Sequence, residues 1–147
     1  MYSDRISRQA WLPLGAALIV AISAFGSFSS IAAAADIQVT LAGDQEVPPV
    51  KSAGAGTGTI VIGTDRTVSG SVTSTGIAGT AAHIHEAAPG KNGPVIVPLT
   101  KNGDTYAVAP GAKLTDAQFA SFQAGNLYVN VHTAANPGGE IRGQLKP

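Results

Sequence analysis

Alternation of apolar and polar residues dominates the chain beyond residue 35 and predicts β-strands. Ile37 to Leu41 is a clear example, because its aliphatic residues occupy every second position. Similar runs recur along the chain, separated by turns rich in glycine, proline and asparagine. The expected strands are residues 37–41, 57–62, 67–73, 81–86, 94–99, 104–108, 127–133 and 140–145.

One helix is predicted between Thr115 and Gly125. Thr115 and Gln118 have the spacing of a capping box, and Leu114 and Phe119 have that of a hydrophobic staple. Gly125 is a typical residue just beyond a helix end. We expect this helix to cover one end of the sheet core.

Many short strands with one helix predict an all-β fold, an antiparallel β-sandwich of Greek-key, superoxide-dismutase-like type. In the last strand, Ile141 should face the core, whereas Glu140 and Arg142 should point outward. We expect these two to form an exposed ion pair of little energetic value. The alternative is that Arg142 leans over a cluster formed by the histidines of the chain and attracts an anion.

Residues 1–35 have the layout of a secretory signal peptide. Arg5 and Arg8 precede an apolar run from residue 11 to about residue 25, and small residues end at Ala35. The alternative, a membrane-anchoring helix, fits less well because the run is short and interrupted by glycine and serine. We expect cleavage after Ala35 and a periplasmic or secreted product, residues 36–147, without a membrane span.

The charge of residues 36–147 bears on possible partners. Five Lys and two Arg stand against five Asp and three Glu, a net charge of −1 with neutral histidines. Without a basic cluster, nucleic acid is not an expected partner. The chain has no cysteine, which excludes disulfides and a lipid-anchored cysteine.

The three histidines of the chain fall in two predicted strands. His83 and His85 are two residues apart and share one face, with Ile84 on the other. In residues 127–133, His132 shares a face with Tyr128 and Asn130. If the two strands are neighbours with their aliphatic faces inward, all three imidazoles emerge on the same side.

Three neutral imidazoles make a suitable site for copper or zinc, and copper is favoured by the affinity order for nitrogen ligands. Tyr128, Asn130 and Arg142 are candidates to support the ligands. Glu86 should point away by alternation, so a bulge would be needed to bring it to the ion. The alternative is that the histidines only hydrogen-bond to backbone or to one another. Nothing in the sequence suggests a catalytic nucleophile.

Five ordered motifs resemble the chordin-type (CHRD) domain over residues 37–145 and assign residues 36–147 to it. The motifs are Leu41-Ala42-Gly43-Asp44-Gln45-Glu46-Val47-Pro48-Pro49-Val50, Ala82-His83-Ile84-His85, Asn92-Gly93-Pro94-Val95, Gly125-Asn126-Leu127-Tyr128-Val129-Asn130-Val131-His132-Thr133 and Gly139-Glu140-Ile141-Arg142-Gly143-Gln144-Leu145. The family is named for repeats in an extracellular developmental antagonist and includes single-domain secreted bacterial proteins. The resemblance implies an exported all-β domain.

The histidine pattern is also similar to the copper-ligand layout of copper/zinc superoxide dismutases. In that likeness His83, His85 and His132 match copper ligands, and Arg142 falls near the position of a substrate-guiding arginine. The bridging histidine, the zinc-loop histidines and the cysteine pair have no counterpart, so a two-metal site cannot form.

The sequence therefore predicts an exported protein that binds one metal ion, preferably copper, in copper handling or tolerance. An interaction or structural module without metal is the alternative, and a dismutase-like redox enzyme is a third possibility.

Overall fold

A computed structural model describes residues 34–147 as eight antiparallel strands with one α-helix and one short 3₁₀-helix. The strands are β1 (Ala35–Ala42), β2 (Ala55–Ile62), β3 (Val68–Thr75), β4 (Gly79–Glu86), β5 (Val95–Asn102), β6 (Thr105–Val108), β7 (Leu127–Thr133) and β8 (Ile141–Leu145). The helices are η1 (Gly43–Gln45) and α1 (Asp116–Gln123). Every predicted strand is present, with shifts of a few residues at the ends.

The predicted signal peptide lies outside the described residues except for its last two alanines. Ala35 opens β1 and pairs with Ile62 of β2. Among residues 34–147, no helix is long and apolar enough to cross a membrane.

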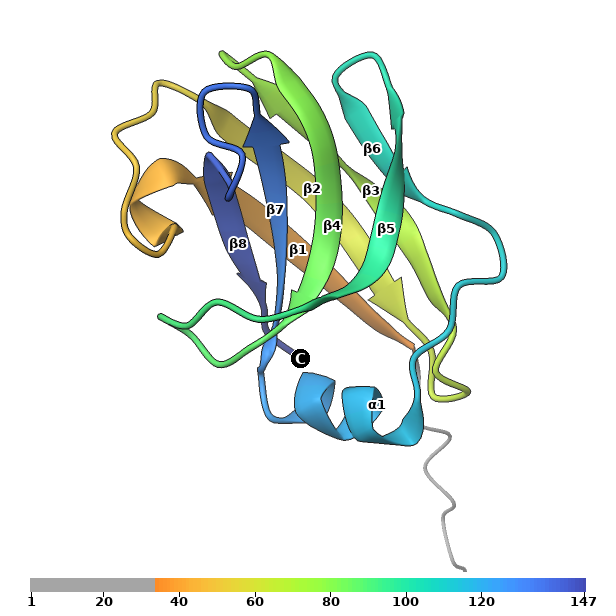
Figure 1. Ribbon diagram of the computed structural model, residues 1–147. Coiled ribbons are helices and arrows are strands. Elements are labelled where there is room, and N and C mark those ends of the chain that lie inside the picture. Colours follow the sequence, from red (N-terminus) through yellow and green to blue (C-terminus); the bar gives the residue numbers. More distant parts are fainter. Residues whose placement is uncertain (1–33) are drawn as a thin grey trace, which may run out of the picture. The chain divides into compact units, whose positions relative to one another are not determined.

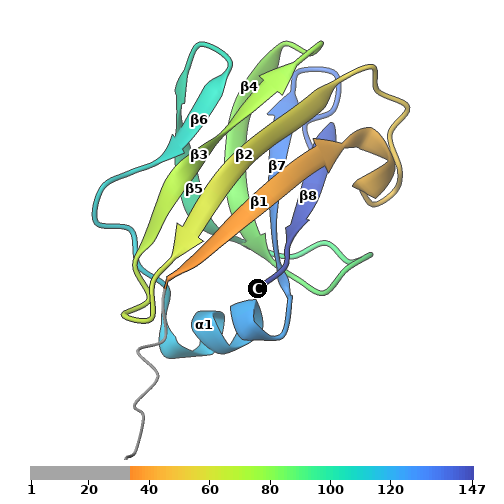
Figure 2. The ribbon, with the colours of Figure 1, turned by 180° about the vertical axis from the view of Figure 1, so that it is seen from behind.

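The strands form a closed barrel in the order β1-β2-β3-β6-β5-β4-β7-β8 (Figures 1 and 2). The prediction of an all-β antiparallel fold with one short helix is confirmed, but the prediction of a sandwich is wrong. The sheet closes because β1 pairs with β8, through Ala42 and Arg142. Alternation identifies the buried face of each strand, but it does not say whether the first and last strands meet.

The core fills the inside of the barrel with aliphatic side chains from all eight strands. Its most completely buried members include Leu41, Ile60, Ile84, Val129 and Ile141, each with no exposed surface. Ile84 and Val129 are the inward residues of β4 and β7, and they are partners in the register. The residues next to them in sequence must therefore point outward, which places the histidines on the outer surface of the barrel.

Helix α1 lies at one end of the barrel (Figures 1 and 2). The predicted capping box is confirmed, since the Gln118 amide donates to the Thr115 hydroxyl and the Thr115 amide donates to the Gln118 side chain. Gly125 follows the C-terminal end of the helix; it has a positive φ of 74° and its amide donates to the carbonyl of Phe122. Phe122 is buried against the core, so α1 covers this end as expected.

Candidate metal centre

The register between β4 and β7 builds a polar patch on the outside of the barrel. His83 is opposite Asn130, His85 is opposite Tyr128, and His132 is opposite Ala81. Residues opposite each other on paired strands point to the same side. The predicted adjacency of the two strands is therefore present, and it brings all three histidines to one face.

The three imidazoles lie close enough to share one ion. One ring nitrogen from each histidine lies within 4.8 Å of those of the other two. The ring centroids are 4.9 Å apart for His83 and His132, and 5.7 Å apart for His83 and His85. Ligand nitrogens bonded at about 2.0–2.1 Å to a tetrahedral ion lie about 3.3 Å apart, so a pair at the 4.8 Å limit would close by about 1.5 Å.

Two backbone carbonyls orient the rings of His85 and His132. His85 Nδ1 donates to the Gly93 carbonyl at 3.0 Å, and His132 Nδ1 donates to the Pro137 carbonyl at 2.9 Å. A carbonyl can only accept, so in the neutral ring the proton is on Nδ1 and Nε2 keeps a free lone pair. His85 Nε2 is buried and has no hydrogen-bond partner among the described residues.

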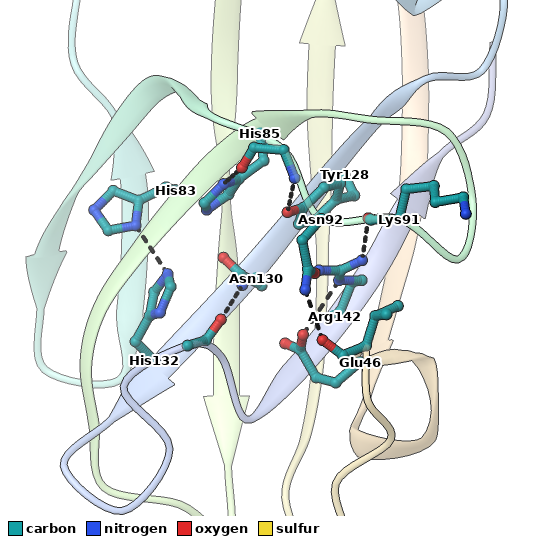
Figure 3. Close-up of polar contacts among 12 residues, drawn as sticks. Glu46, His83, His85, Lys91, Asn92, Tyr128, Asn130, His132 and Arg142 are labelled. Atoms are coloured by element: carbon teal, nitrogen blue, oxygen red, sulfur yellow. Dashed lines mark hydrogen bonds and ion pairs between the residues drawn. The ribbon is translucent and has the colours of Figure 1, made fainter.

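His83 faces the cluster through its Nδ1, which lies 3.0 Å from His132 Nε2 (Figure 3). Since His132 Nε2 carries a lone pair, His83 donates in the neutral state. Moving that proton to Nε2 of His83 would free its Nδ1 as a ligand atom. His83 and His132 are both partly exposed, whereas His85 is buried. The cluster is therefore open to solvent on the side of His83 and His132.

The surroundings of the cluster favour uncharged imidazoles. Burial lowers the pKa of His83 below its usual 6.5, and the nearby His132 and His85 lower it further. Burial also lowers the pKa of His85, and the Gly93 carbonyl partly opposes this effect. Because the neutral form of imidazole is the metal ligand, both rings are ready to bind at neutral pH.

Tyr128 and Arg142 stack beside His85. The rings of His85 and Tyr128 are 7° from parallel, with centroids 4.8 Å apart. The Arg142 guanidinium carbon lies 3.7 Å from the centroid of the Tyr128 ring. The Tyr128 hydroxyl accepts from the Gly93 amide at 3.2 Å. Tyr128 thus contacts His85 directly and also holds the residue whose carbonyl orients it.

Arg142 points away from the core as predicted, but it is 2% exposed rather than at the surface. Its Nε lies 3.2 Å from Glu46 Oε2 in a buried ion pair, and its Nη1 donates to the Lys91 carbonyl at 2.9 Å. Its Nη2 donates to the side chain of Asn92. The nitrogens of the guanidinium therefore already contact protein groups, and the side chain is not available to bind an anion.

The predicted ion pair between Glu140 and Arg142 is wrong. The Glu140 carboxylate accepts instead from Ser52, Thr133 and Asn136, and these hydrogen bonds lower its pKa. Alternation gave the correct side of the sheet for both residues. It could not show that the loops after β1 and β4 fold back over the outer face and cover Arg142.

Glu46, Asn92 and Gly93 belong to the site, although the pattern of residues did not predict this role. Asn92 donates to the Val47 carbonyl at 2.7 Å and so joins the two covering loops (Figure 3). A Cβ on Gly93 would lie 1.8 Å from the Glu86 carbonyl oxygen, so this position requires glycine. Burial raises the pKa of Glu46, whereas Arg142 opposes the rise. The signals in the sequence for these residues are two of the motifs that resemble the CHRD domain, residues 41–50 and residues 92–95.

Glu86 lies away from the histidines. The pairing of β4 with β5 shifts register between Ile84 and His85, but this irregularity does not bring Glu86 to the cluster. Its carboxylate accepts from the Ser121 hydroxyl of α1 at 2.5 Å. Glu86 therefore ties the helix to the barrel.

The arrangement offers nitrogen lone pairs from three strand-borne rings, one of them buried and two of them accessible. Such a site can hold one divalent ion and leave a position for a further ligand. In the comparisons with known proteins, the CHRD domain family matches residues 37–145. No curated protein and no solved structure matches the chain. The match spans most of the chain and includes both histidine strands, and the protein therefore belongs to the CHRD domain family.

Proposed function

We propose that this CHRD-domain protein is exported and binds a single copper ion through His83, His85 and His132, in copper handling or tolerance. The observation that carries the proposal is the buried, unpartnered Nε2 of His85, on one of three histidines that can each bring a ring nitrogen within 4.8 Å of the others. A buried acceptor without a partner is costly, and a bound cation would satisfy it.

Copper is preferred to zinc because Cu(II) binds nitrogen sites more tightly than the other first-row divalent ions. Zinc remains the alternative, since three histidines and one further ligand also suit a tetrahedral zinc site. The partial exposure of His83 and His132 gives an ion a route to the site from solvent. Export rests on the signal-peptide pattern of residues 1–35.

A second function, a structural or interaction module without metal, is favoured by one specific observation. His83 and His132 already satisfy each other through the 3.0 Å contact, and His132 also bonds to Pro137. Two of the three rings therefore have partners without an ion. The buried Nε2 of His85 is the atom that this alternative leaves unexplained.

Titration of the metal-free protein with Cu(II) separates the two functions. We expect micromolar or tighter binding of one ion, weakened strongly in His83→Ala and in His132→Ala. Asn102→Ala is the control, since Asn102 is an exposed residue at the end of β5. Metal binding to the folded state must also raise the melting temperature as metal concentration rises. Equal binding by the wild type and both histidine variants would exclude the site.

A further inference from the structure

Asn130 lies beside the histidine cluster, on the outer face of β7. In the register between β4 and β7 it is opposite His83, and along β7 it is two residues from His132 on the same face. His85 is diagonal to it, and Figure 3 shows the amide of Asn130 between the rings of His85 and His132. Each histidine of the cluster is therefore a neighbour of Asn130 along or across the strands, and the side chain of His85 contacts its amide.

The orientation of the Asn130 amide follows from its neighbours. Its Nδ2 donates to the Gly138 carbonyl at 3.4 Å. The Glu46 carboxylate is a second acceptor beside the same end of the amide, and a Cβ on Gly139 would touch both groups. Because two acceptors surround this end, it must carry the nitrogen, and the oxygen must be at the other end.

The Asn130 oxygen is turned toward His85. Asn130 Oδ1 can accept from a protonated His85 and so raises its pKa, but burial lowers that pKa more and favours the neutral ring. In the neutral ring, Asn130 Oδ1 and His85 Nε2 are both buried and lack a hydrogen-bond partner among residues 34–147. In the neutral ring of His85, Nε2 carries a lone pair and no proton. Nε2 and Asn130 Oδ1 are therefore two acceptors that face each other without a proton between them. A cation placed between them would satisfy both atoms at once.

We propose that the side-chain oxygen of Asn130 is the fourth ligand of the metal held by His83, His85 and His132. This inference rests on the proposed function and gives it a donor set of three imidazole nitrogens and one amide oxygen. Such a set suits Cu(II) or Zn(II), whereas Cu(I) is selected by soft sulfur ligands. The chain has no cysteine, and its one methionine is Met1.

Co(II) and azide probe the fourth position directly. With Asn130 as a ligand, the Co(II)-loaded wild type shows the intense visible bands of a four-coordinate ion and binds azide weakly. Asn130→Ala vacates the position, so azide affinity rises by about 10-fold or more, since an open fourth position takes an exogenous ligand. The same azide affinity in the wild type and in Asn130→Ala would overturn the assignment.

Because a carboxylate at this position lies beside Glu46 and the Gly138 carbonyl, circular dichroism must first show that the variants at Asn130 are folded. Asn130→Asp keeps the size of the side chain and an oxygen at the proposed ligand position. Its carboxylate would remain a ligand and add a negative charge, so Co(II) affinity rises by about 10-fold or more and the visible bands shift. Asn102→Asp adds the same charge on the exposed β5–β6 hairpin and should change neither property. Unchanged bands in Asn130→Asp contradict the assignment. If the wild type binds neither Cu(II) nor Co(II), the metal site itself is contradicted. If the wild type binds these ions and both variants of Asn130 behave like it, only the assignment of Asn130 as a ligand is contradicted.

Discussion

The imidazole of His85 lies parallel to the phenol ring of Tyr128, with centroids 4.8 Å apart, and both are buried. The same tyrosine accepts a hydrogen bond from the amide of Gly93, whose carbonyl accepts from His85. One aromatic side chain therefore sets the position of a proposed ligand in two ways, by stacking on its ring and by holding the backbone that orients it.

Removing the hydroxyl of Tyr128 should be costly, whereas removing that of Tyr106 should not. Tyr128→Phe leaves the half-buried Gly93 amide without its acceptor, a loss of about 1 kcal/mol. The Tyr106 hydroxyl is buried without a partner among the described residues, so Tyr106→Phe should be neutral or stabilising. Urea denaturation of both variants checks this contrast. Equal losses of unfolding free energy would show that the bond to Gly93 contributes nothing.

Acidification should destabilise the metal-free protein. The pKa values of His83 and His85 are lowered in the folded state from the usual 6.5, mainly by burial. The unfolded chain therefore binds more protons, so the contribution of these residues to stability is complete above pH 6.5 and is lost as the pH falls below it.

Thermal unfolding between pH 5 and pH 8 measures this dependence. We expect the melting temperature to decline below about pH 6.5 and to decline less in His85→Gln, which cannot take up the proton. Because the raised pKa of Glu46 acts in the opposite direction, the comparison with His85→Gln is decisive, and equal declines in the two proteins would contradict the lowered pKa of His85.

The buried ion pair between Glu46 and Arg142 should be far more sensitive to substitution than a surface pair. Arg142→Met leaves the Glu46 carboxylate buried and unpaired, a loss of about 3–5 kcal/mol. Arg66 and Asp116 form an ion pair in which the Asp116 side chain is 87% exposed, so Arg66→Met should cost about 1 kcal/mol or less. Chemical denaturation of the two variants provides the comparison. Replacing both Glu46 and Arg142 by apolar residues should recover part of the loss.

Gly93→Ala should damage the metal centre. The new Cβ would lie 1.8 Å from the Glu86 carbonyl oxygen, so the loop must move and carry the Gly93 carbonyl away from His85. We expect weaker Cu(II) binding by about 10–100-fold, the usual effect of disturbing the partner of a metal-bound histidine. Gly103→Ala is the control, because a Cβ there meets nothing within 4 Å and the residue lies on the β5–β6 hairpin, apart from the site residues. Similar Cu(II) affinities of both variants would show that the loop containing Gly93 does not affect metal binding.

The sequence predicted the histidine cluster because strand alternation is a local property. His83 and His85 had to share a face, and the apolar residues of the same strands fixed that face as the outer one. The capping box of α1 was predictable for the same reason, since Thr115 and Gln118 are three residues apart.

Contacts between segments distant in sequence could not be predicted in this way. Arg142 has the outward position of a surface residue, yet it is covered by Glu46, from nearly one hundred positions earlier, and by the loop containing Asn92. Barrel closure is a similar case. No pattern within β1 or β8 specifies that Ala42 and Arg142 become partners.

That closing pair gives Arg142 a double position. Its backbone pairs β8 with β1 and so joins the two ends of the sheet. Its side chain donates to the Lys91 carbonyl, in the same loop as the Gly93 carbonyl that orients His85. Weaker pairing of β1 with β8 would therefore disturb the orientation of His85 and the proposed metal site. A bound ion would in turn stabilise the pairing of the two strands.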